Sequence, residues 1–293
     1  MAQTRLLWQS KLVLLLVMPF AAANVVLQTH WWAVQAAPVA IWTCGLSLLL
    51  GLVSFQLRSA TLGAAAAGAT ITASLMFSTA TVPYLPWRTA LVPVLAVIVL
   101  TAIATRLGRG VEEQLGTAES RSGRTAAQVV ANLGVAAIAS NDLAQTWLFG
   151  QDWLHAAPVA LLAPGLAAMA EAAADTVSSE IGQMLNEHPF MITTLRRAQP
   201  GTDGAISLGG TLAGTVAAAV VAAAGSLALR GGLPMMVLSF SGGIFGLFFD
   251  SLLGATLERR GWLNNDAVNF LSTASAAAFA LALLAALPHL GIS

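Results

Sequence analysis

The chain is short of charge and of cysteine. Only 9% of its 293 residues are charged, and its formal net charge is zero, whereas a soluble domain carries about 25% charged residues. The scarcity of charge excludes an ordinary soluble domain, and the balance of charge excludes a strongly basic nucleic-acid binder. Cys44 is the only cysteine, which excludes a disulfide framework and a cysteine-based metal site.

Long apolar runs are what the sequence has in abundance. Hydrophobic residues make up 57% of the chain. In lipid, the polar backbone groups of a span must be hydrogen-bonded within the protein, so a span is either a helix or a strand of a closed barrel. The alternating pattern of barrel strands is absent from this sequence, so helices are expected. The predicted fold class is an all-α polytopic membrane protein of about nine transmembrane helices, at residues 11–28, 38–57, 60–82, 89–107, 127–149, 156–176, 207–229, 233–256 and 268–288. The fifth is the weakest, because it contains Asn141, Asp142 and Gln145.

Basic residues assign the two sides of the membrane. With the N-terminus in the cytoplasm, every Lys and Arg except Arg88 and Arg230 falls on the cytoplasmic side, as the positive-inside rule requires. We therefore expect an integral protein of a bacterial inner membrane, or its equivalent, with a cytoplasmic active site. Residues 1–37 are expected to form an N-terminal anchor span, and residues 38–293 the membrane catalytic domain. A cleaved signal peptide is the alternative for the first span.

Two polar segments share the same order of residues. Asp175-Thr176 and Asp250-Ser251 are each followed by an arginine pair and then by an aspartate. Both segments enter from the same side, so they would form a parallel internal repeat rather than an inverted one. The aspartates that follow the arginine pairs are Asp203 and Asp266.

Carboxylates near the cytoplasmic ends of two spans predict a metal site. Glu171 and Asp175 are four residues apart, so they share a helix face, and Asp250 stands alone in an apolar helix. A charge at mid-bilayer costs about 2.5–3.5 kcal/mol on insertion scales, so these groups call for a cation. Mg²⁺ fits, since it is usually held by one or two carboxylates with water and phosphate. The expected ligands are Asp175, Asp250 and Glu180, and a solvated helix end is the alternative, strongest for Glu171.

Glycine-rich and basic segments predict phosphate binding. The stretch QPGTDGAISLGGTLAG, residues 199–214, is a turn that runs into a helix, and backbone N–H groups at such a start bind phosphate. It lacks the lysine of a P-loop. Arg121 and Arg124 are expected to neutralise phosphate charge, although ordinary positive-inside topology also explains them. Asn265 is expected to cap the last span, with Asp266 in its first turn, and a binding role for both is the alternative.

Together these residues indicate a class of reaction. Acidic metal ligands, arginines and glycine-rich turns at one membrane face are the groups that phosphoryl transfer uses. Their position at the interface suggests one lipid substrate and one soluble substrate. No Ser-His-Asp set or nucleophilic cysteine is in position, which argues against acyl transfer.

Four ordered motifs resemble a known integral-membrane family. ADTVSSEIG, PGTDGAISLGGTLAG, FDSLLGAT and LNNDAVNFLST are similar to a family long without a defined function. It includes the phytyl-phosphate kinases of the vitamin E (tocopherol) pathway in plants and cyanobacteria, and an animal transmembrane protein, number nineteen of its series. The upstream SRSGRTAAQVVANLG resembles the arginine-loop segment of that family.

The resemblance implies that a phytyl- or geranylgeranyl-type isoprenyl monophosphate is converted to the diphosphate. Mg²⁺ and a nucleoside triphosphate, CTP or ATP, would take part. The expected catalytic residues are Asp175, Glu180, Asp250, Asp203 and Arg124. The expected nucleotide-binding and phosphate-binding residues are Ser178, Ser179, Gly201, Thr202, Gly204, Ser251, Asn265, Asp266, Asn269 and Arg121.

Some features depart from the family pattern and leave alternatives open. Glu112, Glu113 and Glu119 make the loop after the fourth span less basic than the pattern, which leaves the exact substrate open. A cytidylyltransferase that forms a CDP-lipid would use the same metal chemistry but release pyrophosphate. A lipid or small-molecule transporter is the third hypothesis, and it expects polar groups near mid-bilayer and inverted repeats. The partners expected are a membrane lipid and a nucleotide, with a homo-oligomer as a further candidate.

Overall fold

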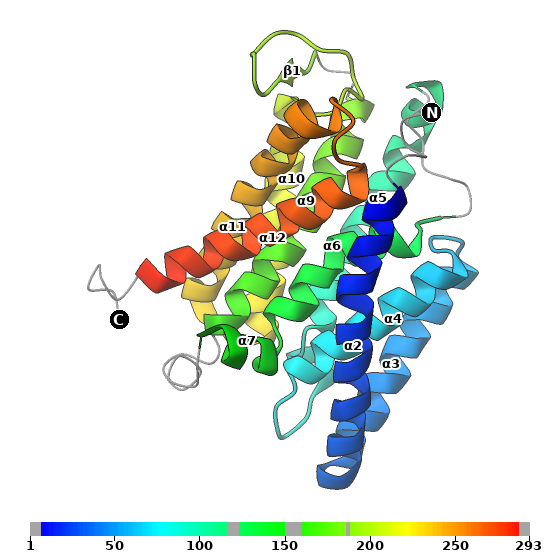
Figure 1. Cartoon of the computed structure of the whole chain (residues 1–293), viewed down its shortest axis with the longest axis vertical. Coiled ribbons are helices and arrows are strands. Elements are labelled where there is room, and N and C mark those ends of the chain that lie inside the picture. The colour runs from blue at the N-terminus through cyan, green and yellow to red at the C-terminus, as the bar shows by residue number, and fades with distance from the viewer. Residues whose placement is uncertain (1–6, 116–122, 150–159, 186–187, 287–293) are drawn as a thin grey trace.

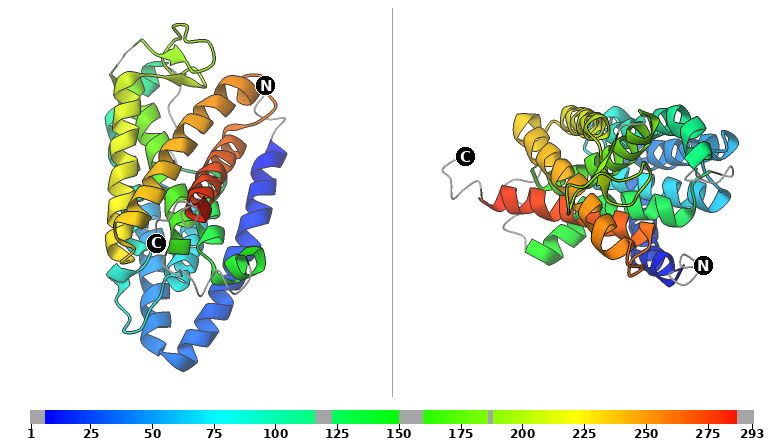
Figure 2. Two further views of the ribbon diagram at one scale, coloured as in Figure 1. Left: turned by 90° about the vertical axis from the view of Figure 1, so that its left-hand side faces the viewer. Right: turned by 90° about the horizontal axis from the view of Figure 1, so that it is seen from above.

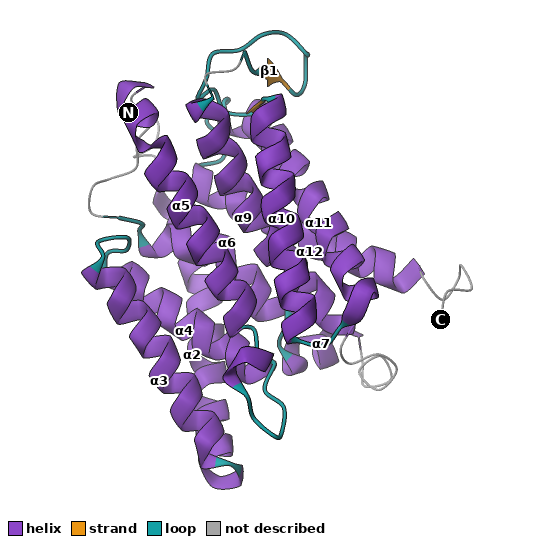
Figure 3. Cartoon of the chain, turned by 180° about the vertical axis from the view of Figure 1, so that it is seen from behind, coloured by secondary structure: helices purple, strands orange, loops and turns teal. Residues whose placement is uncertain are grey.

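The protein is almost entirely helical in its computed structural model, which describes residues 7–115, 123–149, 160–185 and 188–286 (Figure 3). The main helices are α2 (Leu7–Gln35), α3 (Ala37–Gln56), α4 (Leu62–Ser78), α5 (Leu91–Leu115), α6 (Ala126–Ala139), α7 (Asp142–Phe149), α9 (Ala163–Met184), α10 (Leu208–Ala228), α11 (Gly232–Leu253) and α12 (Asn265–Ala286). Short 3-10 turns cover Pro86–Arg88 and Ala160–Leu162, and a π-helical turn, η3 (Gly254–Glu258), continues α11. The strands β1 (Phe190–Met191) and β2 (Ala205–Ile206) pair antiparallel in a hairpin.

The helices confirm a polytopic all-α membrane protein. Six of those described are long and apolar enough to cross a membrane, namely α2, α3, α5, α10, α11 with its π-helical extension, and α12. The apolar helices α4 and α6 are shorter. The hairpin, the start of α2 and the end of α5 lie at the same end of the molecule (Figures 1 and 2).

The fifth expected span, 127–149, is not one helix, and that prediction was wrong. Helix α6 ends at Ala139 and α7 begins at Asp142. Between them the Asn141 side-chain oxygen accepts hydrogen bonds from the amides of Leu143 and Ala144, at 3.0 and 3.1 Å. An asparagine that bonds to the following backbone favours a turn and a helix start over a continuous helix. The polar residues that weakened the prediction are therefore the cause of the break.

The sixth expected span, 156–176, corresponds to α9, which begins later and runs further, from Ala163 to Met184. Every residue from 163 to 174 is buried, because α5, α6, α10, α11 and α12 all pack around this helix (Figure 1). A helix enclosed by protein on all sides does not need a lipid-facing apolar surface. Because α9 continues to Met184, Glu171 lies near the middle of the helix. The hydropathy pattern predicts a position near the end of a span.

Close packing around α9 depends on residues without large side chains. A Cβ atom added at Gly242 of α11 would lie 2.6 Å from the Ala276 carbonyl oxygen and 2.8 Å from the Ala167 Cβ. Neither neighbour is a flexible side-chain end, so α11 can approach both α9 and α12 only if this position carries no side chain. Small residues allow this close approach of helices within a membrane.

Helix α2 is joined to the start of α12 by hydrogen bonds. Gln9 donates to the Trp262 carbonyl and accepts from the Asn264 amide, both at 2.8 Å. Ser10 donates to Asp266 at 2.5 Å and accepts from the Asn264 side chain at 2.9 Å. The expected division at residue 37 stays a prediction, but these bonds show that α2 packs as part of the bundle.

The cap of α12 differs from the expected one. The Asn264 side-chain oxygen accepts from the Ala267 amide at 2.9 Å, so Asn264 caps the helix and Asn265 is its first residue. The sequence offers two consecutive asparagines, and the choice between them depends on the contact of Asn264 with Gln9 and Ser10.

Gly242→Ala should destabilise the bundle by about 1–3 kcal/mol, because the added methyl group overpacks a rigid contact. Gly45→Ala is the matched control, since no atom lies within 4 Å of a Cβ added there. It should leave stability unchanged or slightly higher, because alanine favours helix more than glycine does. Thermal unfolding in detergent checks both, and equal midpoints would contradict the packing argument.

Candidate functional site

The site is centred on two carboxyl groups from facing helices. Asp175 of α9 and Asp250 of α11 lie close enough for each carboxyl group to act electrostatically on the other. The Asp250 Oδ2 atom is buried and has no hydrogen-bond partner among the described residues. The structure thus brings together the two aspartates that the sequence patterns matched. Two such groups at low dielectric need a cation or a shared proton.

Glu171 adjoins this pair one helical turn away. Ser272 of α12 lies near both Glu171 and Asp250, and its hydroxyl donates to the Asn269 carbonyl at 3.0 Å. Glu171 is 1% exposed, and its Oε1 atom has no partner within the described chain. A Cβ added at Gly246 would be 2.5 Å from the Glu171 Cγ, so this glycine makes the space that the glutamate occupies. Sequence reasoning ranked Glu171 below Glu180, and the structure places Glu171 nearer to the aspartates.

Glu258 is a further carboxylate that the sequence patterns did not single out as a site residue. It ends the π-helical turn η3, and its charge acts on both Asp175 and Asp250. A π-turn shifts the helix face by a residue and often occurs at functional sites. The nearest sequence signal is an isolated acidic residue two turns after Asp250, which is too weak to identify the position.

Glu180 lies apart from the aspartate pair. It accepts a hydrogen bond from the Thr105 hydroxyl of α5 at 2.8 Å. Its other oxygen, Oε2, is buried beside Gly108, where an added Cβ would be 2.5 Å away. Five residues along a helix turn through about 500°, so Asp175 and Glu180 point to different sides of α9. The expected three-ligand set with Asp175 and Asp250 is therefore not formed.

The positions of the carboxyl groups decide how the site could bind a magnesium ion. Among the described residues, no three His, Cys, Asp or Glu side chains converge to hold a metal ion. Two carboxyl groups do meet, and one of their buried oxygens lacks a partner. Mg²⁺ is usually bound by one or two carboxylates, with substrate phosphates and water as the other ligands. Asp175 and Asp250 fit an ion that arrives with a phosphate, and they do not form a metal cage by themselves.

Arg124 connects the carboxyl groups to a cavity. Its positive charge acts on Asp175, and it also lines a cavity of about 300 Å³ between α3, α4, α5, α6 and α9. Three more arginines line the same cavity, and no described lining residue is acidic. The remaining walls are mainly apolar, with Asn132 and a few threonines and serines among them. The additional arginines are Arg58, Arg106 and Arg109.

The backbone around Arg124 is fixed by a glycine contact. The Arg124 amide donates to the Ser59 carbonyl at 3.1 Å, and its carbonyl accepts from the Thr61 amide at 3.0 Å. Gly123 adopts φ +82°. A Cβ atom there would be 2.5 to 2.7 Å from the backbone of residues 58–60. The loop before α6 thus pairs directly with the loop before α4, which places Arg124 beside Arg58.

The glycine-rich turn lies next to the π-helical turn. Gly204 adopts φ +74°, and an added Cβ would overlap the Ala255 backbone. Burial raises the pKa of Asp203, and the nearby Arg259 charge opposes this shift. The amides of Thr202 and Ala205 bond to carbonyls within the turn, and Ser207 caps α10 by accepting from the Gly210 amide at 3.1 Å. Phosphate binding by Gly201, Thr202 and Gly204 stays a prediction.

The two segments proposed as a repeat differ in local structure. Residues 196–203 belong to the β-hairpin loop, whereas residues 259–264 form a turn that leads into α12, which includes Asp266. Asp203 faces Arg259, while Asp266 accepts from Ser10 of α2. The shared sequence pattern therefore does not produce two equivalent sites.

The other expected residues have separate environments. Ser179 donates to the Thr176 carbonyl at 3.2 Å and Ser251 to the Leu247 carbonyl at 3.3 Å. Ser178 is half-buried against α10, where its Cβ would be 2.9 Å from a Cβ added at Gly214. Asn265 is exposed and Asn269 is buried. Arg121 lies outside the described residues.

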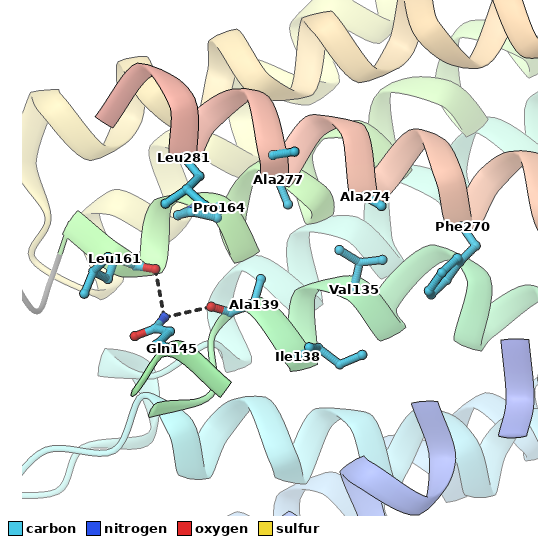
Figure 4. Close-up of a pocket in the computed structure, with 11 residues that line it drawn as sticks. Val135, Ile138, Ala139, Gln145, Leu161, Pro164, Phe270, Ala274, Ala277 and Leu281 are labelled. Carbon is cyan, nitrogen blue, oxygen red and sulfur yellow. Dashed lines mark hydrogen bonds between the residues drawn. The ribbon is translucent and has the colours of Figure 1, made fainter. Parts of the chain in front are cut away.

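A second cavity, of about 280 Å³, lies between α6, α7, α9 and α12 (Figure 4). Its walls are almost wholly apolar, with Phe270 and Leu281 among them. Gln145 is the one polar side chain of its described lining, and its amide nitrogen donates to the carbonyls of Ala139 and Leu161, at 2.7 and 2.9 Å (Figure 4). None of the described residues that line this cavity is suited to acid–base or metal chemistry.

Together, the half-buried carboxyl pair and the arginine-lined cavity define a polytopic membrane protein with a polar site inside a helical bundle. The chain belongs to the integral membrane protein family DUF92, whose model matches residues 45–277. This confirms the family that the four motifs resemble. Helix α2 lies outside the matched region.

Three relatives illustrate the range of the similarity. An uncharacterized membrane protein of Methanocaldococcus jannaschii is 36% identical over 62% of this chain and 71% of its own length. An uncharacterized membrane protein of Synechocystis is 34% identical over 67% of this chain and 74% of its own. The chloroplast protein VTE6 of Arabidopsis thaliana is 28% identical over 61% of this chain and 54% of its own. No solved structure matches the chain.

Gly123→Ala should loosen the contact that positions Arg124, since an alanine at this φ is strained and its methyl group would overlap the backbone of residues 58–60. We expect faster amide hydrogen exchange at Thr61 and Arg124, whose amides are bonded in the native loop pair. Gly110→Ala is the control, because nothing lies within 4 Å of its added Cβ. Unchanged protection in Gly123→Ala would contradict this role.

Proposed function

We propose that the protein transfers a phosphoryl group from a nucleoside triphosphate, CTP or ATP, to an isoprenyl monophosphate and forms the diphosphate. One observation carries the proposal: Arg124 lines the arginine-lined cavity, and its positive charge also acts on Asp175 of the carboxyl pair. A lipid phosphate at the arginines would thus lie beside a site suited to a metal-bound triphosphate. The membership in DUF92 and the similarity to VTE6 support a function related to prenyl phosphates.

The lipid side of the proposal depends on the cavity. Arg58, Arg106, Arg109 and Arg124 would neutralise the phosphate, and guanidinium groups match the geometry of phosphate oxygens. The apolar walls below them suit a hydrocarbon chain. A phosphate monoester is already an adequate nucleophile, so the chain needs to supply no general base. Its contribution is to position the two phosphates and to balance their charge.

The nucleotide side depends on Asp175 and Asp250. With the triphosphate these two groups would hold Mg²⁺, which neutralises charge that develops on the transferred phosphoryl group. Glu171 and Ser272, which lie next to the two aspartates, would help to orient their carboxyl groups. Arg124 would stand between donor and acceptor, where a positive charge favours the transition state. Roles for Ser178, Ser179, Ser251 and Asn269 in nucleotide binding are part of the proposal and rest on the motif resemblance.

The membrane side of the site is also proposed. The arginine end of the cavity corresponds to the side that the positive-inside rule assigns to the cytoplasm. A cytoplasmic site would have direct access to soluble nucleotides. The hairpin that bears Arg196 and Arg197 lies at the same side.

Purified protein in detergent or nanodiscs, given Mg²⁺, CTP or ATP, and phytyl or geranylgeranyl phosphate, should produce prenyl diphosphate and a nucleoside diphosphate. Mass spectrometry identifies both products. Release of pyrophosphate with formation of a CDP-lipid would instead identify a cytidylyltransferase. Absence of turnover with every lipid phosphate and nucleotide would refute both activities.

Asp250→Asn should lower turnover by roughly 100-fold or more, because removing a metal ligand loses several kcal/mol of transition-state stabilisation. Binding of Mn²⁺ with a non-hydrolysable nucleotide, followed by electron paramagnetic resonance, should weaken in parallel. The exposed Asp142 of α7 provides the control, and Asp142→Asn should change neither quantity. Full activity and full metal binding in Asp250→Asn would refute the assignment.

A further inference from the structure

The arginine-lined cavity is elongated along the helices that form it. On α4 and the loop before it, Ala60, Ala64, Gly68 and Thr72 line the cavity at four-residue intervals, so they follow one face of the helix. On α5 the lining runs from Arg109 back to Val97. A separation of 12 residues corresponds to about 18 Å along a helix. The cavity therefore extends from the arginines through roughly half of a hydrocarbon layer of about 30 Å.

The two ends of the cavity have different chemistry. All four arginines lie at the end of the cavity nearest the membrane surface, where α3 and α5 terminate and α4 begins. Its deeper walls carry Leu50, Val97 and Ile98. Val53 and Leu57 of α3 line the cavity and are nevertheless exposed. The cavity consequently opens sideways onto the lipid-facing surface of α3, which gives a membrane lipid a route of entry.

We infer that the cavity binds one isoprenyl chain with its phosphate at the arginines, and that Gly68 determines which chain lengths fit. The inference rests on the proposed function and adds to it a specificity-determining residue. The positive end matches a phosphate monoester, and the mainly apolar remainder of the cavity matches one polyprenyl tail. A shorter tail ends above Gly68, and a longer tail passes beside it.

The surroundings of Gly68 support this role. It lies about 6 Å along α4 from Ala64, on the side away from the loop that bears Arg58. Among the described residues outside its own helix backbone, the one atom within 4 Å of a Cβ added there is the Val129 Cγ1, at 3.7 Å, which is an ordinary contact. The position is therefore open to a larger side chain, unlike Gly51, where an added Cβ would be 2.8 Å from the Ala65 carbonyl oxygen. A leucine at 68 would fill the channel and leave the helix packing in place.

Kinetics with two substrates test the inference. For Gly68→Leu, the ratio of kcat/KM for phytyl phosphate to that for geranyl phosphate should fall at least about tenfold, because a tenfold change equals the burial of about two CH₂ groups. Gly68→Ala should shift the ratio only slightly. Gly45→Leu is the matched control, since its added Cβ has no neighbour within 4 Å and it does not line the cavity. It should keep the wild-type ratio.

A binding measurement separates this inference from the proposed reaction. Phytyl phosphate with a diazirine at the tail end should label residues of α3, α4 and α5 near Leu50, Thr72 and Val97, and Gly68→Leu should abolish that labelling. Such labelling without turnover would refute the reaction and support the binding site. Equal loss for both substrates in Gly68→Leu, or labelling confined to the second cavity near Phe270, would refute the inference even if the wild-type protein is active.

Discussion

The burial of carboxyl groups inside the bundle is the constraint on which the rest of the structure depends. An unpaired charge in a low-dielectric interior is destabilising by several kcal/mol. Glu171 and Asp175 nevertheless lie on the enclosed helix α9, and Asp250 lies on α11, which is apolar and long enough to cross a membrane. Part of the compensation comes from the loop before α6, where Arg124 carries a positive charge that acts on Asp175. The oxygens that still lack partners mark where a ligand charge would complete the balance.

This constraint also explains the small residues of the core. A central helix can be enclosed on all sides only if its neighbours approach closely, and the residues that face α9 are largely alanine and glycine. Gly246 has a second effect, since it leaves space for the Glu171 side chain. The high alanine and glycine content is therefore linked to the buried polar site as well as to general packing between membrane helices.

Much of this arrangement could be predicted from the sequence, because apolar runs and repeated motifs are local properties. The helices appear at most of the expected places, and Asp175 and Asp250 face each other as their matched motifs indicate. The opposite orientation of Glu180 depends on how α9 rotates between α5 and α11, which no motif specifies. The break at Asn141 and the π-turn that brings Glu258 to the site depend on single hydrogen bonds and on helix register.

The arginine-lined cavity was the least predictable feature. Its walls come from five helices, and Arg58 and Arg124 become neighbours only through the pairing of two loops at Gly123. Arg58 and Arg106 are ordinary positive-inside residues when read in sequence. Their grouping around a channel arises from tertiary packing, so a linear pattern does not reveal it.

The hydrogen bond from Ser10 to Asp266 bears on how the family has evolved. The region shared by the family begins at residue 45, so a helix outside it supplies the partner of a motif residue inside it. A motif aspartate can therefore be retained for reasons that differ between members: an interhelical bond in one and a ligand contact in another. Identity at this position among relatives is compatible with different uses of the same side chain.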